Sequence, residues 1–186
     1  MNKGKLIILS GPSGVGKGTV RERLFEDEDL HLAYSISMTT RQPRPGEVHG
    51  VDYFFVTEEE FKTNIAQQGL IEWAQFVGNY YGTPRQYVEE LLEQGNNVLL
   101  EIEVQGATQV IAMFPEALTI FIVPPSIEEL ERRIRGRRTE EESVVAQRLN
   151  KAKYELTLTD NYKFVVENND LEQTVKEIHD IIEKNI

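Results

Sequence analysis

The sequence predicts an α/β protein in which helices flank a parallel sheet. Apolar runs of strand length recur along the chain, and segments with helical periodicity separate them. Such alternation is typical of parallel sheets whose connecting helices cover both faces. A chain of 186 residues can bury a substantial core, so we expect a single domain over residues 1–186. The four runs are Leu6–Leu9, Val98–Ile102, Thr119–Val123 and Phe164–Val166.

The first apolar run leads into a glycine-rich loop. Leu6–Leu9 is unbroken, as in a strand buried on both faces, and the glycines after it permit a tight turn with positive φ. Lys17 adds a cation, and a helix expected over Thr19–Phe25 adds the dipole of its N-terminus. The pattern G-x-x-x-x-G-K therefore predicts a fold of the P-loop NTPase type that binds a triphosphate; a glycine-rich turn without a ligand is the alternative. The candidate ligands are Gly11, Pro12, Ser13, Gly14, Val15, Gly16, Lys17, Gly18 and Thr19.

One position of this loop departs from the usual pattern. Gly18 stands where a Ser or Thr hydroxyl usually reaches magnesium. The loop therefore predicts no metal ligand from the protein, and we expect Mg²⁺ to arrive with the bound nucleotide triphosphate, held mainly by phosphate oxygens and water.

The composition narrows the possible partners and compartment. The net charge is −11, from 31 acidic and 20 basic residues, which disfavours nucleic acid and anionic membranes as partners. The chain has no cysteine, and no apolar stretch approaches the roughly 18 residues of a membrane span. Because the first predicted strand leaves no room for a signal peptide, we expect a cytoplasmic protein.

Several helix boundaries carry capping signals. A Ser, Thr or Asp followed three residues later by Glu or Gln marks a helix start. The last helix is expected over Leu171–Glu183, with Val175, Ile178, Ile181 and Ile182 on the face that packs on the sheet. The capping pairs are Thr57 with Glu60, Ser126 with Glu129, Thr139 with Glu142, and Asp170 with Gln173.

Residues 36–86 interrupt the alternation of strands and helices and hold most of the aromatic side chains. Within them, Arg41 and Arg44 lie among hydroxyls and prolines, and each guanidinium can donate a fork of hydrogen bonds to phosphate. Tyr53 and Tyr81 can add phenolic donors. A solvated polar loop is the alternative.

Glu72 lies among apolar residues of the same region. A carboxylate accepts hydrogen bonds, and guanine offers an N1–H and an amine on one edge, whereas adenine offers an acceptor at N1. Glu72 therefore favours guanine, although a lone Glu on a strand is more often solvated.

Two further acids follow the second apolar run. Glu101 and Glu103 are alternate residues, expected on one face at the carboxyl end of the strand, where ligands bind in open parallel sheets. They can meet substrate or the water around a metal; an ordinary acidic strand end is the alternative.

An arginine-rich segment lies at about residues 129–153. Arg132 to Arg138 contains five arginines, and Arg148 follows. We expect them to repel one another until phosphate arrives and then to close over it; a solvated helix face is the alternative.

Taken together, these segments resemble the guanylate kinase family of nucleoside monophosphate kinases. The resemblance covers nearly the whole chain. It implies a core at about residues 1–35, 87–128 and 154–186, a GMP-binding lobe at about 36–86 and a lid at about 129–153. The matching motifs are the phosphate loop, S-M-T-T-R-Q-P-R-P-G-E from Ser37, G-V-D-Y from Gly50, I-E-W-A-Q-F from Ile71, G-N-Y-Y-G-T from Gly78, E-I-E-V-Q-G from Glu101 and R-I-R-G-R-R-T from Arg133.

The resemblance also implies roles for individual residues. The loop binds the phosphates of ATP, and Asn168 lies on the adenine side. The implied GMP ligands are Ser37, Arg41, Arg44, Tyr53, Glu72, Tyr81, Thr83, Glu101 and Glu103. The implied catalytic residues are Lys17, Arg41, Arg133, Arg137 and Arg148.

The activity that the resemblance implies is transfer of the γ-phosphoryl group of ATP to GMP, and also to dGMP, in purine nucleotide metabolism. The expected state is a monomer or weak homo-oligomer. A non-catalytic module similar to the guanylate-kinase-like domains of scaffold proteins is one alternative. A kinase for another monophosphate is the second, because Gly18-Thr19 resembles the adenylate kinase form of the loop.

Overall fold

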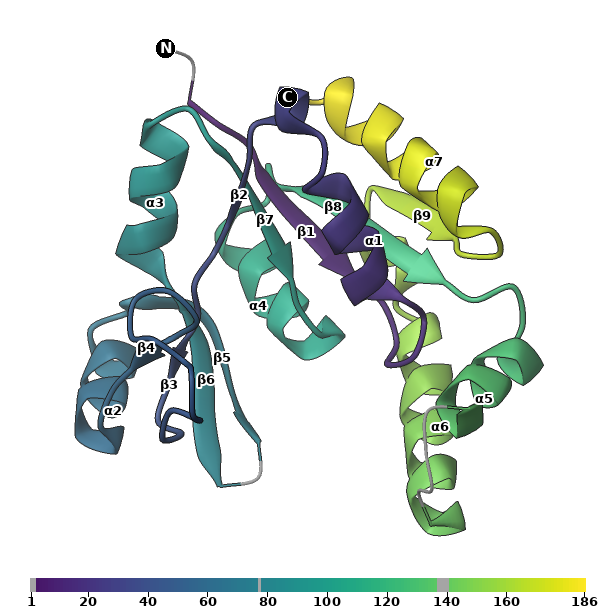
Figure 1. The fold of residues 1–186 in the computed structure, drawn as a ribbon, viewed down its shortest axis with the longest axis horizontal. Helices are drawn as coiled ribbons and strands as arrows, with labels where there is room; N and C mark the ends of the chain where they lie inside the picture. Colours follow the sequence, from purple (N-terminus) through teal and green to yellow (C-terminus); the bar gives the residue numbers. More distant parts are fainter. Residues whose placement is uncertain (1–2, 77, 137–140) are drawn as a thin grey trace.

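A computed structural model describes residues 3–76, 78–136 and 141–186. Its central feature is a five-stranded parallel sheet with the order β2-β7-β1-β8-β9 (Figure 1). Four strands are the predicted apolar runs, and β2, a three-residue edge strand, is too short to stand out in the sequence. The strands are β1 (Leu6–Ser10), β2 (Leu32–Tyr34), β7 (Asn97–Glu101), β8 (Leu118–Val123) and β9 (Phe164–Glu167).

Helices cover both faces of this sheet, as predicted. Side chains alternate along β1, so that Ile7 and Leu9 pack with α1 and α7, whereas Leu6 and Ile8 pack with α3 and α4. All five residues of β1 are buried, as expected for a central parallel strand. The helices are α1 (Lys17–Leu24), α3 (Arg85–Glu93), α4 (Val104–Met113) and α7 (Leu171–Glu183).

The helix boundaries agree with most of the capping signals. Thr57 forms a complete capping box with Glu60, Ser126 Oγ accepts from the Glu129 amide, and Asp170 accepts from the Gln173 amide. The Thr139 signal lies outside the described residues. The first helix begins at Lys17 rather than Thr19, because Gly16 already ends the loop as its N-cap.

The aromatic-rich region forms a second, four-stranded sheet with the order β4-β3-β6-β5, which we call the aromatic lobe. Helix α2 packs on it through Phe61, which is fully buried and stacks on Tyr80 with ring centroids 5.3 Å apart. The lobe contains β3 (Met38–Thr39), β4 (Phe54–Phe55), α2 (Glu58–Ala66), β5 (Leu70–Phe76) and β6 (Asn79–Pro84).

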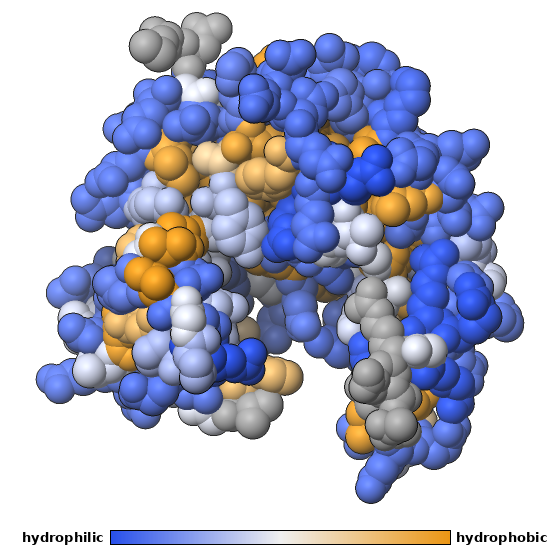
Figure 2. Space-filling model, in the orientation of Figure 1, coloured by the Kyte–Doolittle hydropathy of each residue, from blue (hydrophilic) through white to orange (hydrophobic). Residues whose placement is uncertain are grey.

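Helices α5 (Ile127–Gly136) and α6 (Glu142–Leu156) form what we call the arginine hairpin. It has a small core of its own, made of Leu130, Ile134, Val145 and Ala152. Figure 2 shows a hollow between the aromatic lobe and the arginine hairpin, and strands β1 and β7 run toward it in Figure 1. Among the described residues, none of the helices has both the length and the apolar character needed to cross a membrane.

Candidate active site

The glycine-rich loop joins β1 to α1. Gly11, Gly14 and Gly16 all have positive φ, as predicted. At Gly16, with φ 102°, a Cβ atom would lie 2.6 Å from Asn168 Nδ2, so a side chain has neither the backbone geometry nor the space. Position 16 of the loop therefore requires glycine.

Lys17 is the first residue of α1, and its ammonium group folds back over the loop. Its Nζ donates to the carbonyl oxygens of Gly11, at 2.5 Å, and Pro12, at 3.2 Å. Burial lowers the pKa of Lys17, and the charges of Glu101 and Glu103 oppose that shift. A cavity of about 430 Å³ opens beside it, lined by Ser13, Gly14, Gly16, Lys17, Gly18, Thr19, Glu22, Glu101, Ile102 and Glu103.

The two acids line this cavity from different elements. Strand β7 ends at Glu101, so Glu103 lies at the N-cap of α4, and the expectation of a shared strand face is wrong. Glu101 Oε2 lies 3.1 Å from Arg21 Nη1, and Glu103 Oε2 accepts from Lys151 Nζ at 2.8 Å. Both carboxylates are thus engaged with cations, and Gly18 adds no hydroxyl.

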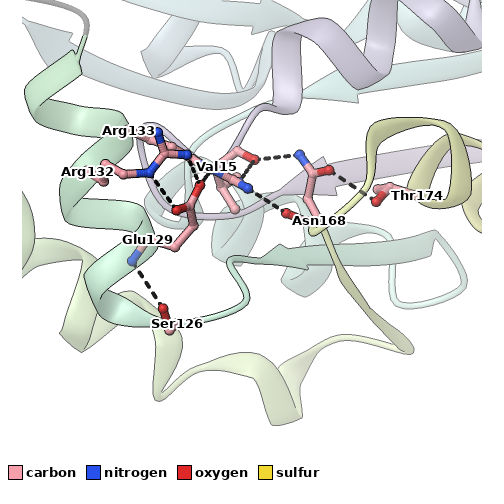
Figure 3. Close-up of polar contacts among 7 residues, drawn as sticks. All are labelled: Val15, Ser126, Glu129, Arg132, Arg133, Asn168 and Thr174. Atoms are coloured by element: carbon pink, nitrogen blue, oxygen red, sulfur yellow. Dashed lines mark hydrogen bonds and ion pairs between the residues drawn. The ribbon is translucent and has the colours of Figure 1, made fainter.

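A second cavity, of about 290 Å³, is lined by the loop together with Arg133 and Asn168, and Figure 3 shows the polar contacts of these two residues. Asn168 Nδ2 donates to the Val15 carbonyl at 2.8 Å, and its Oδ1 accepts from Thr174 Oγ1 at 3.1 Å. Arg133 Nη2 donates to the Asn168 carbonyl at 3.0 Å, while its Nε donates to Glu129. These bonds tie α5, the loop and the end of β9 together around the cavity.

Among the described residues of the hairpin, Arg132, Arg133 and Arg135 each pair with a carboxylate, which offsets the mutual repulsion that we expected. Arg132 and Arg133 share Glu129, whose pKa they lower to about 2, and Arg135 pairs with Glu131 and Glu142. Glu129 and Glu131 lie three or four residues before their arginines on α5, as helix periodicity allows, whereas Glu142 belongs to α6 and links the two helices. Arg137 lies outside the described residues.

Helix α6 also contacts the glycine-rich loop. Arg148 Nη2 donates to Ser13 Oγ at 2.8 Å. Lys151 follows on the same helix and reaches Glu103. Two cations of the hairpin therefore lie at the rim of the first cavity.

In the aromatic lobe, Arg41 makes a bidentate contact with Glu47. Its two terminal nitrogens donate to the two carboxylate oxygens at 3.0 and 2.9 Å. Arg41, together with the Arg44 amide, lowers the pKa of Glu47 to about 2. This guanidinium thus already holds a planar oxyanion through two parallel hydrogen bonds.

The two predicted tyrosines lie beside Arg41. The rings of Tyr53 and Tyr81 meet edge to face with centroids 6.3 Å apart, and the Arg41 guanidinium carbon lies 5.4 Å from the Tyr53 centroid. Arg44 is exposed, and Ser37 is half-buried beside β3. The structure therefore groups Arg41, Tyr53 and Tyr81, whereas no contact places the side chains of Arg44 and Ser37 with them.

Glu72 lies on β5, opposite Thr83 on β6. Thr83 Oγ1 donates to Glu72 Oε1 at 2.6 Å. Burial raises the pKa of Glu72, and the bond from Thr83 partly opposes this shift. The second oxygen, Oε2, is directed toward α4, where it would lie 2.8 Å from a Cβ placed on Gly106.

Sequence reasoning missed Arg21 and Lys151. Arg21 lies four residues after Lys17 on α1, and its guanidinium carbon is 5.2 Å from the Tyr34 ring centroid. Lys151 lies three residues after Arg148 on α6. Helical spacing from a predicted ligand was the signal that could have found both.

Comparison with known proteins agrees with this geometry. A family model for guanylate kinase matches residues 3–185. The chain belongs to the guanylate kinase family. It is 57% identical over 182 residues to a guanylate kinase of Mycoplasma mycoides subsp. mycoides. The aligned region covers 98% of this chain and 61% of that protein. It is 55% identical over 180 residues to a guanylate kinase of Bacillus subtilis, which covers 97% of this chain and 88% of that protein.

The fold agrees as well. The crystal structure of guanylate kinase from Anaplasma phagocytophilum matches with a TM-score of 0.74 and 37% identity, covering 98% of this chain and 86% of that one. The chain spans about three-fifths of the length of the mycoplasma relatives and nearly nine-tenths of the Bacillus ones.

Proposed function

We propose that this protein transfers the γ-phosphoryl group of Mg-ATP to GMP, and also to dGMP, giving ADP and GDP, in purine nucleotide metabolism. One observation carries the proposal. A partly buried carboxylate, Glu72, is held by Thr83 in the aromatic lobe, while the core sheet carries a phosphate-binding loop whose Lys17 lines a cavity of about 430 Å³. The loop accounts for the donor nucleotide and the carboxylate for the base of the acceptor.

On the donor side, backbone N–H groups of residues 11–19, other than Pro12, and the side chain of Lys17 bind the phosphates of ATP. Lys17 exchanges its bonds to Gly11 and Pro12 for phosphate oxygens, which removes the penalty of burying its charge. The cavity beside Asn168 receives the adenine. Arg133, on α5, lines the same cavity and donates to the Asn168 carbonyl. Magnesium enters with ATP, because Gly18 has no hydroxyl and the nearby acids already pair with cations.

On the acceptor side, Arg41 and the two tyrosines bind the phosphate of GMP, assisted by Ser37 and Arg44. The bidentate pair with Glu47 supports this assignment, since a carboxylate and a phosphate accept the same two parallel N–H groups. Phosphate then competes with Glu47 for the guanidinium.

Glu72 and Thr83 select guanine. The carboxylate accepts from guanine N1–H and the 2-amino group, whereas adenine presents an acceptor at N1 that would repel it. Thr83 fixes the carboxylate in place through its hydroxyl. Neither side chain is assigned to a phosphate group. We therefore expect both to determine which monophosphate is accepted rather than the rate of transfer.

The reaction itself requires position and charge. An oxygen of the GMP phosphate attacks the γ-phosphorus in line, ADP leaves, and no covalent enzyme intermediate forms. Lys17, Arg133, Arg137 and Arg148 neutralise the negative charge that spreads over the transferring group. We propose that residues 129–153 act as the lid that brings these arginines in, and that residues 36–86 act as the GMP-binding lobe.

Two alternatives are less well supported. A scaffold module that only binds ligands needs neither Lys17 nor the second cavity at Arg133 and Asn168. A kinase for AMP, CMP or UMP does not need a carboxylate acceptor at Glu72. We also propose that the protein works in the cytoplasm as a monomer or weak homo-oligomer, and that its strongly acidic surface keeps it away from nucleic acid and membranes.

Product analysis tests the proposal against the binding module. The protein, Mg-ATP and GMP are incubated and the nucleotides are separated by chromatography. Formation of ADP and GDP in equal amounts supports a phosphotransferase. Binding of GMP without either product would show a module that has lost catalysis.

A further inference from the structure

Gly106 occupies a position where helix geometry alone would favour another residue. It is the third residue of α4, is buried, and does not have positive φ. Alanine has a clearly higher helix propensity than glycine at such a position. The backbone therefore gives no reason for glycine here, and the reason must lie in what packs against it.

The neighbour that would collide with a side chain at this position is Glu72. A Cβ built on Gly106 would lie 2.8 Å from Glu72 Oε2, 3.4 Å from its Cδ and 3.6 Å from its Cγ. These are the three nearest atoms, and all belong to one side chain. A carbon and an oxygen do not approach to 2.8 Å without one of them moving.

Strand β5 is held against α4, so the strand cannot easily withdraw. Gln109, one helical turn after Gly106, accepts from the Trp73 amide at 3.1 Å and donates to the Trp73 carbonyl at 3.0 Å. This side chain therefore pairs with β5 on its outer edge, as a neighbouring strand would. The residue next to Glu72 is thus fixed to the same helix that carries Gly106.

The Glu72 carboxylate is held from the other side as well. Thr83 Oγ1 binds Oε1 at 2.6 Å, while Oε2 lies over Gly106. The carboxyl group is therefore confined between β6 and α4, and its orientation depends on a helix surface without a side chain.

We propose that Gly106 is a positioning residue for guanine selection: the bare helix surface at Gly106 sets where the Glu72 carboxylate lies. This inference rests on the proposed role of Glu72 in binding guanine. A methyl group at position 106 pushes Oε2 aside, so the carboxylate can no longer meet N1–H and the 2-amino group together. The fold tolerates the change, because the displaced atoms are the end of a flexible side chain.

The first experiment compares Gly106→Ala with the parent protein in steady-state kinetics and thermal unfolding. The KM for GMP should rise about tenfold or more, as expected when a buried hydrogen-bond match is lost. The KM for ATP should stay within about twofold and the unfolding midpoint should not fall, since alanine favours the helix. Gln105→Ala, an exposed change on the same helix, is the control and should leave the KM for GMP unchanged.

The second experiment places Gly106→Ala in a Glu72→Asp background. Aspartate is one methylene shorter and leaves room for the new methyl group, so Gly106→Ala should have little further effect on the KM for GMP there. If the same rise appears in both backgrounds, the effect does not pass through Glu72 and the inference is overturned. If Gly106→Ala alone fails to fold, the double variant should fold; failure of both overturns the inference too.

These results separate the inference from the function on which it rests. If Glu72→Asp leaves the KM for GMP unchanged, the proposed reading of guanine by Glu72 is wrong. If Glu72→Asp raises that KM and Gly106→Ala does not, guanine recognition by Glu72 stands and the role of Gly106 fails.

Discussion

Thr83 Oγ1 donates a hydrogen bond to Glu72 Oε1 over 2.6 Å, across the antiparallel pair β5 and β6. Thr83 is 2% exposed, so this bond forms away from solvent. Burial raises the pKa of Glu72, and the hydroxyl partly compensates by stabilising the ionised form. The Glu72 carboxylate thus carries a desolvation penalty in the folded protein. A nucleobase that donates two hydrogen bonds to it would offset this penalty.

That penalty predicts a pH-dependent effect of Glu72→Gln on stability. A carboxyl group whose pKa is raised by folding contributes stability below its unfolded pKa and loses it as pH rises through the folded pKa. Glutamine does not titrate and can still accept from Thr83. The variant should therefore gain thermal stability relative to the parent as pH rises from acidic to neutral. Unfolding midpoints of both proteins across that range test this, and a constant difference would contradict it.

Lys17→Met should nearly abolish phosphoryl transfer while leaving GMP binding intact. The lysine is assigned to the phosphates of ATP and contacts the glycine-rich loop, not the aromatic lobe. We expect a loss of kcat of about a hundredfold or more, the scale of one preorganised electrostatic contact. Kinetics and GMP calorimetry on the same preparation measure both quantities. Turnover within about twofold of the parent would rule out the assignment of Lys17.

The sequence was sufficient for the core of the fold. The runs at β1, β7, β8 and β9 were visible because buried parallel strands are continuously apolar, and the last helix matched Leu171–Glu183. The three-residue strand β2 was not visible, since a short, partly exposed edge strand has no distinct pattern.

The site could be predicted only where a motif fixed it. Positive φ at the three loop glycines followed from the spacing of the phosphate loop. Ion pairs were harder to predict, because they depend on which side chains the folded chain brings within reach. Examples are the pair of Arg41 with Glu47 and the pair of Arg21 with Glu101. The contact between Gly106 and Glu72 joins residues 34 positions apart in the chain and leaves no local signal.

The arginine hairpin should become more protected when both nucleotides bind. Arg148 contacts Ser13, and Arg133 contacts the carbonyl of Asn168, so bound phosphates would draw these side chains further onto the loop. Amide hydrogen exchange in α5 and α6 should slow with ATP and GMP analogues present together. Equal exchange in the free and doubly bound protein would indicate a static, solvated helix pair.

Magnesium should bind poorly to the protein alone yet be required for turnover. Glu101 pairs with Arg21, Glu103 pairs with Lys151, and Gly18 offers no ligand, so the first cavity lacks a free set of oxygen ligands among the described residues. Calorimetric titration of Mg²⁺ without nucleotide should detect no tight site, whereas its omission should stop the reaction. A tight site in the free protein would contradict this account, and Glu101 and Glu103 would be the first residues to replace.

Acceptor selectivity tests the central claim most directly. ADP release from Mg-ATP is measured with GMP, AMP, CMP and UMP, for the parent protein and for Glu72→Gln. The parent should release ADP rapidly with GMP and at background with the other three. Glu72→Gln should need at least about tenfold more GMP, because an amide nitrogen replaces one acceptor. Faster turnover with another monophosphate, or unchanged use of GMP by the folded variant, would contradict the assignment of Glu72 to guanine.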